Sequence, residues 1–292
     1  MRRLLLSVAL ITTLTSIANA QQPGGGRGTT PEPVAAPRQL KPGFFLITGA
    51  GANTAVRVTP EGLIVVDTKN PSTETNNIFA GLNTQLKAIS PLPVKYILNT
   101  HHHPDHTGNN GALVDLGAKV VGLEMLKKNM ADDPRTTQIP GRPTETFAND
   151  YVLKFGGVQV EAHHLGNAHT NDDTVVYFPD LKIAMISDTV TDTNPVVDWA
   201  NGGSVVGWKA SLEAILKVDF ETAIPGRGEP RSKADVAAFK TKIDTLIDRG
   251  NAAIKAGATK DGFMAQVKLD DLSWTLNKAF FDSFFDELSK AK

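Results

Sequence analysis

The sequence predicts a layered α/β domain, because strands and helices follow one another in the same order twice along the chain. Short apolar runs such as Leu63–Val66 and Ala184–Ile186 are typical of strands that are buried on both faces. Apolar residues four positions apart, such as Ile78, Leu82 and Leu86, indicate an amphipathic helix. Each half of the chain therefore contributes strands, a helix, a further strand and further helices.

Each element follows from a local pattern. Turn signals separate the strands at Pro60-Glu61-Gly62, Gly156-Gly157 and Pro179-Asp180, and Asp132–Pro143 is expected to be a mobile surface loop. The expected strands are Phe44–Thr59, Leu63–Asp67, Val94–Asn99, Lys119–Gly122, Tyr151–Phe155, Val158–His163, Thr174–Phe178, Ile183–Ser187 and Thr222–Ile224. The expected helices are Thr73–Ser90, Gly111–Leu116, Leu123–Met130, Val205–Val218, Lys233–Ala256, 259–267 and 274–290. On the last helix, Phe280, Phe281, Phe284 and Phe285 are expected to pack in the core rather than to bind a cofactor.

The N-terminus has the features of an export signal. Arg2 and Arg3 are followed by the apolar stretch Leu4–Ile17 and by Ala18-Asn19-Ala20, an A-x-A cleavage site. This stretch is too short and too rich in Ser and Thr to span a membrane comfortably, so no stable membrane anchor is expected after cleavage. The Gly, Pro and Gln content of the next segment predicts a flexible linker. The expected organisation is a signal peptide at 1–20, a linker at 21–42 and one domain at 43–292, in the periplasm or outside the cell.

Composition narrows the partners and the sources of stability. The formal net charge is −1 and the chain has no basic block, so no nucleic-acid partner is expected. The chain has no cysteine, and an exported protein without disulfides must be held together by its core and by any metal that it binds.

All seven histidines lie in two short segments. The first segment, residues 100–108, reads T-H-H-H-P-D-H-T-G and contains the pattern H-x-H-x-D-H. Neutral imidazole is the commonest protein ligand for transition metals. Several imidazoles and a carboxylate within six residues therefore predict a metal site.

Spacing suggests which histidines face the metal. His101 and His103 are two residues apart, so on an extended segment they point the same way, whereas His102 points the opposite way. Asp105 and His106 follow a proline and can reach a neighbouring point. The turn around His169 can supply a third nitrogen, and three imidazoles with one open position are typical of catalytic zinc. The remaining histidines, His163 and His164, are expected to pack or to support a ligand.

Two carboxylates end apolar strands. Asp188 follows Ala184–Ser187, where a carboxylate is costly to bury unless it is paired or bound to metal. Asp67 ends another such strand, and we expect it either to orient a metal ligand or to be a simple turn residue.

These motifs resemble the metallo-β-lactamase superfamily of metal-dependent hydrolases. The resemblance covers about residues 43–250 and rests on the H-x-H-x-D-H loop, the Gly-x-x-His-Thr turn at His169, Asp188 and the segment Ile224–Gly228. It implies a four-layer αββα sandwich with metals at one edge of the two sheets. It also implies a first metal site of His101, His103 and His169, and a second site of Asp105 and His106, with Asp188 bridging the two.

One residue departs from the family pattern. The family usually has Gly-His-Gly where this chain has Gly226-Arg227-Gly228, and that histidine completes the second metal site. Arginine stays protonated and does not bind zinc, so one Zn²⁺ is expected and a tight second metal is not. The guanidinium of Arg227 can instead pair with Asp105 or Asp188, clamp a substrate carboxylate, or lie on the surface of a displaced loop.

Asp188 also bears on the substrate. In cysteine-containing metallo-β-lactamases this place is a thiol, whereas glyoxalase II-like thioesterases and lactonases have Asp. The lactonase group has a tyrosine shortly after this carboxylate, but here Thr189-Val190-Thr191 follow. Neither a true lactamase nor a quorum-signal lactonase fits cleanly.

The expected function is therefore an exported zinc-dependent hydrolase of a small carbonyl substrate, namely a β-lactam, lactone, ester or thioester. Zinc would activate water, Asp105 would orient that water and accept its proton, and the metal with Arg227 would stabilise the oxyanion.

Two other functions stay open. One is a persulfide dioxygenase-type enzyme with Fe²⁺ held by His101, His169 and Asp188. The other is a metal-binding protein whose catalysis Arg227 has disabled.

The loops Asn70–Glu74, Asp132–Pro143 and Thr189–Gly203 are expected to shape the pocket but show no readable chemistry. Trp199 and Trp208 line that pocket or pack in the core.

Overall fold

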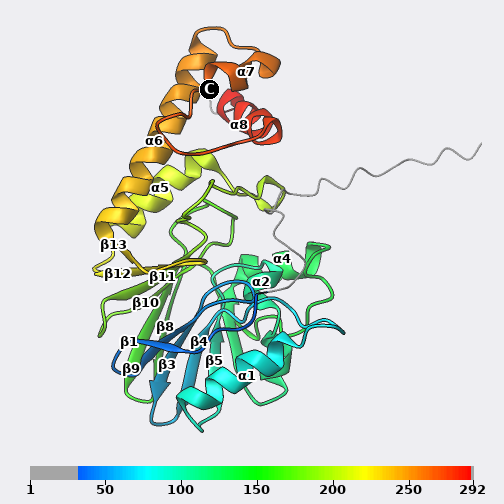
Figure 1. Cartoon of the computed structure of the whole chain (residues 1–292), viewed down its shortest axis with the longest axis vertical. Coiled ribbons are helices and arrows are strands. Elements are labelled where there is room, and N and C mark those ends of the chain that lie inside the picture. Colours follow the sequence, from blue (N-terminus) through cyan, green and yellow to red (C-terminus); the bar gives the residue numbers. More distant parts are fainter. Residues whose placement is uncertain (1–31, 291–292) are drawn as a thin grey trace, which may run out of the picture. The chain divides into compact units, whose positions relative to one another are not determined.

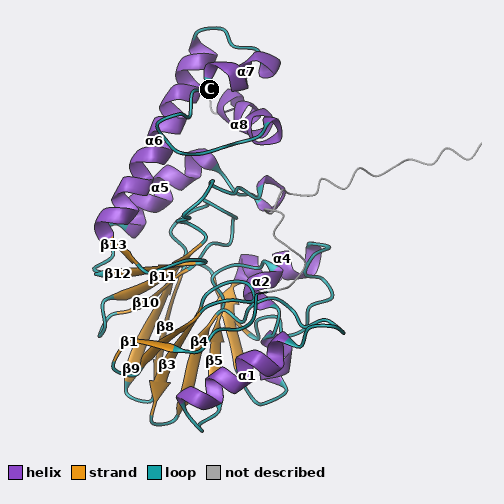
Figure 2. Cartoon of the chain, viewed as in Figure 1, coloured by secondary structure: helices purple, strands orange, loops and turns teal. Residues whose placement is uncertain are grey.

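The computed structural model describes residues 32–290, and these form two β-sheets that lie face to face (Figure 1). The predicted signal peptide, 1–20, and the linker up to residue 31 lie outside the described residues. Figure 2 shows the strands of the two sheets together, with the helices outside them.

The first sheet has seven strands in the order β1-β2-β3-β4-β5-β6-β7. Strands β1 to β4 pair antiparallel, whereas β4 to β7 pair parallel. The strands are β1 (Arg38–Lys41), β2 (Phe44–Ile47), β3 (Thr54–Thr59), β4 (Gly62–Val66), β5 (Val94–Leu98), β6 (Lys119–Leu123) and β7 (Glu145–Phe147).

The second sheet has six strands in the order β13-β12-β11-β10-β9-β8. Only β11 and β12 pair parallel in it; the other neighbours are antiparallel. The strands are β8 (Asp150–Phe155), β9 (Val158–His163), β10 (Val175–Phe178), β11 (Ile183–Ser187), β12 (Thr222–Pro225) and β13 (Arg231–Ser232).

Helices cover the outer face of each sheet. α1 lies against the first sheet, and α6 begins directly after β13 and continues towards α7 and α8 (Figure 1). The helices are α1 (Ile78–Ile89), α2 (Pro104–Thr107), α3 (Asn110–Val114), α4 (Glu124–Asp132), α5 (Val205–Ile215), α6 (Lys233–Lys255), α7 (Lys260–Gln266) and α8 (Lys278–Lys290), with a 3₁₀ turn at Trp199–Asn201. None of the helices within residues 32–290 is both long and apolar enough to cross a bilayer.

Strand alternation divides the apolar residues into three cores. In β4, Ile64 and Val66 face the second sheet, whereas Leu63 and Val65 pack against Leu82 of α1. The second sheet behaves likewise. Its inner residues Val176, Phe178 and Met185 meet the first sheet, and its outer residues Val175, Tyr177 and Ile186 meet the C-terminal helices. Three cores between four layers confirm the predicted αββα sandwich.

Several predicted boundaries were wrong. The predicted strand Phe44–Thr59 is two strands, because the chain reverses at residues 48–53, where Gly49, Ala50 and Gly51 have positive φ. Within the predicted linker, residues 38–41 form β1, because they pair with β2. The predicted helix Thr73–Ser90 begins only at Ile78, since the Asn77 side chain caps it by accepting a hydrogen bond from Ala80 N.

The ends of the predicted helices and the shortest elements also differ. Val205–Val218 ends at Ile215, and the helix predicted at 274–290 begins at Lys278, because Asn277 accepts a hydrogen bond from Phe280 N. Strands β7 and β13 and helix α2 were not predicted, and each has only two to four residues. The phenylalanines of α8 do pack in the core: Phe280, Phe281 and Phe284 are buried, and Phe285 is partly buried against them.

Candidate metal centre

Five segments deliver the candidate residues to one edge of the sandwich. The histidine loop follows the carboxyl end of β5, and Asp67 follows the parallel neighbour β4. On the second sheet, Asp188 follows β11 and Arg227 follows its parallel neighbour β12. His169 lies between β9 and β10. Parallel strands end at the same edge of a sheet, which is why these residues meet although they are far apart in sequence.

The first histidine group consists of His101, His103 and His169, which are all buried. Each offers a ring nitrogen within 4.8 Å of the other two. His103 Nδ1 lies 3.0 Å from His169 Nε2, and His101 Nε2 is buried without a hydrogen-bond partner among the described residues. Burial with neighbouring imidazoles holds the pKa of His101 well below its usual range, and burial lowers the pKa of His103 to about 4. Both rings therefore present unprotonated nitrogen.

Two hydrogen bonds fix the rings of this group. His103 Nε2 donates to Asp198 Oδ2 at 2.8 Å, and His169 Nδ1 donates to the backbone carbonyl of Val196 at 2.7 Å. Each bond uses the nitrogen on the far side of the ring and so leaves the other nitrogen free to bind a metal. Both partners lie in the loop 189–203, and no local sequence pattern marks either of them as a partner of the histidines.

The charged group consists of Asp105, His106, Asp188 and Arg227. Pro104 starts α2, whose single turn turns Asp105 and His106 towards the group. His106 Nε2 lies 3.4 Å from Asp105 Oδ2 and 3.7 Å from Asp188 Oδ1. Like His101 Nε2, it is buried and has no hydrogen-bond partner within residues 32–290.

Asp67 supports this group from behind. Its Oδ2 accepts hydrogen bonds from His106 Nδ1 and from Thr100 Oγ1, both at 2.7 Å, and its Oδ1 accepts one from Thr100 N. The residue is fully buried and contacts a candidate ligand rather than the candidate site itself. The contact expected for Asp67 is therefore present in the structure.

Arg227 pairs with both carboxylates of the charged group. Its Nη2 contacts Asp105 Oδ2, and its Nη1 lies 3.2 Å from Asp188 Oδ2, while 58% of its side chain stays exposed. The backbone must approach Asp188 closely here, because a Cβ at Gly226 would collide with the Asp188 carboxylate. Asn53 holds the segment in place: its N donates to Gly226 O at 2.7 Å, and its side chain donates to two neighbouring carbonyls. Of the three placements considered for Arg227, pairing is the one that the structure has.

The charges of this group shape its protonation. Burial opposes ionisation of Asp105 and Asp188, but His106 and Arg227 outweigh it and hold the pKa of both carboxyls below the usual range. Burial likewise opposes protonation of His106, but Asp105, Asp67 and Asp188 raise its pKa well above the usual value. Without metal, the group therefore carries ionised carboxylates, a protonated imidazole and a guanidinium.

His102 belongs to a separate network, in agreement with its opposite parity. Its Nδ1 lies 2.9 Å from Asp172 Oδ1 and its Nε2 3.2 Å from Asp133 Oδ2. Arg135 joins Asp133 to Asp198 and so connects this network to the bond that fixes His103. The predicted loop Asp132–Pro143 thereby contributes charged partners that sequence reasoning had missed.

The remaining candidates lie away from the two groups. Trp208 is fully buried in the core and donates from Nε1 to Thr189 O, and Trp199 donates to Glu287 of α8. His163 pairs with Asp150 and Glu161 on the sheet, and His164 Nδ1 lies 2.9 Å from Asp173 O.

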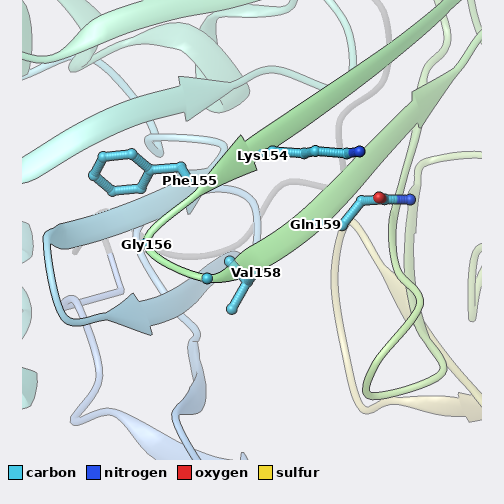
Figure 3. Close-up of a pocket in the computed structure, with 6 residues that line it drawn as sticks. Lys154, Phe155, Gly156, Val158 and Gln159 are labelled. Carbon is cyan, nitrogen blue, oxygen red and sulfur yellow. The ribbon is translucent and has the colours of Figure 1, made fainter.

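A hollow at the β8–β9 turn lies at the far end of β9 from His169. Figure 3 shows Lys154 and Gln159 pointing to one side of this turn and Phe155 pointing to the other. None of the candidate site residues lines this hollow.

Non-glycine residues with positive φ turn the chain at two strand ends. Asp67 (φ 60) and Lys69 (φ 66) follow β4, and Ser187 (φ 50) ends β11 directly before Asp188. Lys69 is fully buried, and its Nζ donates to Ile47 O and Ala52 O, both at 2.9 Å. Burial lowers the pKa of Lys69 to about 7, although Asp67 and Glu32 act to raise it.

The donors present fit a metal ion. Three buried imidazoles with converging ring nitrogens make a suitable site for zinc, and His101 Nε2 lacks, within residues 32–290, the hydrogen-bond partner that buried polar atoms require. His101 is close to both groups, because it also offers a nitrogen to His106 and Asp188. A dication in the first histidine group would satisfy His101 Nε2.

Comparison with known proteins agrees with this geometry. A family model described as the metallo-beta-lactamase superfamily matches residues 48–227, which is more than half of the chain. The linear primary-alkylsulfatase of a Pseudomonas species is 25% identical over 262 residues, which cover 72% of this chain and 48% of that protein. The type 2 metallo-beta-lactamase of Bacillus cereus is 27% identical over 198 residues, which cover 64% of this chain and 71% of that protein. The chain thus spans about half the length of the alkylsulfatase and more of the lactamase.

A solved structure shares the fold. The metallo-beta-lactamase from Pontibacter korlensis superposes with a TM-score of 0.64 at 23% identity, over 71% of this chain and 98% of that one.

Proposed function

The chain belongs to the metallo-β-lactamase superfamily, which includes metal-binding hydrolases, and from this membership we propose that it is a metal-dependent hydrolase of a small ester-like substrate. The observation that carries the proposal is His101 Nε2, a buried imidazole nitrogen of the first histidine group that has no hydrogen-bond partner among the described residues. A purely structural site would leave this nitrogen unsatisfied at a cost of about 1–3 kcal/mol.

In this proposal His101, His103 and His169 hold one zinc. When bound, the metal supplies Lewis-acid chemistry, which polarises a substrate oxygen and makes water more acidic. The residues of the charged group supply the rest. Asp105 is ionised and 17% of its side chain is exposed, so it can orient a water molecule and accept its proton. The exposed guanidinium of Arg227 donates to the oxyanion that forms on the substrate.

The substrate class follows from the relatives and the site together. The relatives include enzymes named for β-lactams and for alkyl sulfates, and both kinds of substrate develop negative charge on an oxygen during hydrolysis. We therefore propose a lactam, lactone, ester, thioester or sulfate ester. We also propose that the protein acts in the periplasm or outside the cell, because residues 1–20 have the pattern of a cleaved signal.

The first experiment is the metal content of residues 21–292, purified without added metal and measured by elemental mass spectrometry. We expect about one zinc per chain, with turnover of at least one member of a panel of lactam, lactone, ester, thioester and alkyl sulfate substrates. Two zinc ions would mean that Arg227 moves away and a second site fills. Iron with dioxygen consumption on a persulfide would favour the oxygenase. Metal without turnover on the whole panel would favour a binding protein, and no metal would contradict the proposal.

A further inference from the structure

The loop 189–203 contacts two of the three rings of the first histidine group. It supplies both hydrogen bonds that fix that group: Val196 O accepts from His169, and Asp198 Oδ2 accepts from His103. The loop is also tied to the histidine turn through its backbone, since Asp198 N donates to His169 O at 2.8 Å. Any displacement of this loop would therefore rotate two candidate ligands at once.

Helix α8 holds the far end of this loop through one carboxylate. Glu287 Oε1 accepts from Ser204 Oγ at 2.6 Å and from Val206 N at 2.9 Å. Its Oε2 accepts from Trp199 Nε1 at 3.0 Å and from Val205 N at 3.2 Å. Four donors on a single carboxylate, at the N-terminus of the eleven-residue helix α5, make a strong charge-assisted contact.

A second contact ties the start of the loop to the same C-terminal region. Asn194 Nδ2 donates to Thr275 O at 2.6 Å, and Thr275 N donates back to Asn194 Oδ1 at 2.8 Å. The ring of Trp199 also packs edge-on against Phe280 of α8, with centroids 5.2 Å apart. Val196 and Asp198 thus lie between two anchored points.

We propose that Glu287 is a positioning residue of the metal centre, which it serves by clamping the loop that orients His103 and His169. This inference rests on the proposed metal binding. It assigns a role to α8, which lies beyond the residues 48–227 that the family model matches. Stabilisation of α5 alone is the competing explanation, and it predicts no change at the metal centre.

The test compares Glu287→Ala, Glu287→Gln and Asn194→Ala with Asp286→Asn, a control on the same helix whose carboxylate is exposed and pairs with Lys260. Two quantities are measured on folded, full-length mature protein. Hydrogen exchange of the metal-free protein reports protection of residues 189–206. Competition of Zn²⁺ against a chelator reports metal affinity, independently of any substrate.

We expect Glu287→Ala to lower the protection of residues 189–206 and to weaken Zn²⁺ binding about 10-fold, as loss of an outer partner of a ligand does. Glu287→Gln should fall between Ala and wild type, because its amide group would face the donors Trp199 Nε1 and Val205 N. Asn194→Ala should act in the same direction but less, and Asp286→Asn should match the wild type.

Lost protection with Zn²⁺ affinity within about twofold of wild type would overturn the positioning role, as would unchanged protection. If Glu287→Ala does not fold, Glu287→Gln and Asn194→Ala decide by the same criteria. A wild type that binds no Zn²⁺ would overturn the proposed function and this inference with it, whereas a metal-binding wild type with unaffected variants would overturn this inference alone.

Discussion

The first histidine group and the charged group lie side by side, with His101 close to both, yet they are prepared for a cation in opposite ways. In the first group, low pKa values keep His101 and His103 neutral, and His103 and His169 are already oriented by the hydrogen bonds that they donate to Asp198 and Val196. The charged group is filled before any metal arrives, because Arg227 pairs with both of its carboxylates.

This difference predicts unequal metal affinity. A metal entering the first group displaces no side chain, and the lowered pKa values of His101 and His103 leave these two rings unprotonated. A metal entering the charged group must remove a proton from His106, whose pKa is raised, and must move Arg227 away from Asp105. We therefore expect the first histidine group to hold the metal and the charged group to supply charge and proton transfer.

The largest expected difference in metal binding is between variants that each lose one candidate ligand, one variant from each group. We expect His103→Ala to lose the metal, with affinity falling more than about 100-fold and turnover falling to background, because one of three oriented nitrogens is gone. His106→Ala should keep about one metal per chain. Elemental mass spectrometry and chelator competition measure both variants. Equal loss of metal from both would show that the groups act as one site.

Asp105→Asn should separate chemistry from metal binding. The amide cannot accept a proton, so turnover should fall by about 10²–10⁴-fold, whereas the metal content should stay at the wild-type value. Steady-state kinetics and metal analysis on the same preparation check this result. Asp132→Asn, on an exposed pair with Lys128, is the matched control. Surviving turnover would mean that another group accepts the proton.

Arg227→His should convert the charged group into a second metal site. The imidazole would replace a permanent cation with a ligand, so the stoichiometry should rise from about one zinc per chain to about two. Arg227→Ala also removes the cation but adds no ligand, and it should stay near one. A second zinc in the alanine variant would assign the effect to charge alone.

The smallest expected effect concerns Lys69, which lies outside the two groups and also has a shifted pKa. Its folded pKa of about 7 lies below the ordinary 10.5, so between these values the unfolded chain holds a proton that the folded chain lacks. Stability from this group should therefore rise with pH, by up to about 1.4 kcal/mol per unit. Urea unfolding of wild type and Lys69→Met at pH 7.5 and pH 9 measures the slope. Parallel behaviour of the two proteins would show that Lys69 stays protonated in the fold.

The sequence predicted the parts of this comparison that depend on local pattern. The H-x-H-x-D-H loop, the turn at His169 and the strand-ending Asp188 can be read because their spacing is short, and the sandwich follows from strand order. The pairing of Arg227 could be predicted because Arg227 stands where the family usually has a histidine that completes the second metal site, next to Asp105 and Asp188.

The residues that orient the site could not be predicted in this way. Asp198 and Val196 lie in a loop without periodicity, and their partners His103 and His169 are distant in sequence. Lys69 looks like a surface residue, since nothing near it indicates that two backbone carbonyls will enclose its ammonium group. The strand Phe44–Thr59 was too long because a reversal through Gly49–Gly51 interrupts an otherwise continuous β pattern.

The left-handed residues at the ends of β4 and β11 have a consequence for engineering. A non-glycine residue in this conformation costs about 1–2 kcal/mol relative to its preferred backbone, and Ser187 and Lys69 both adopt it. Thermostabilisation would ordinarily start by placing glycine at such positions. Here Ser187 Oγ lies 2.9 Å from Thr100 Oγ1, which donates its proton to Asp67, so the gain in stability would loosen the support of His106. The left-handed backbone at Ser187 is thus coupled to a side chain that supports a candidate metal ligand.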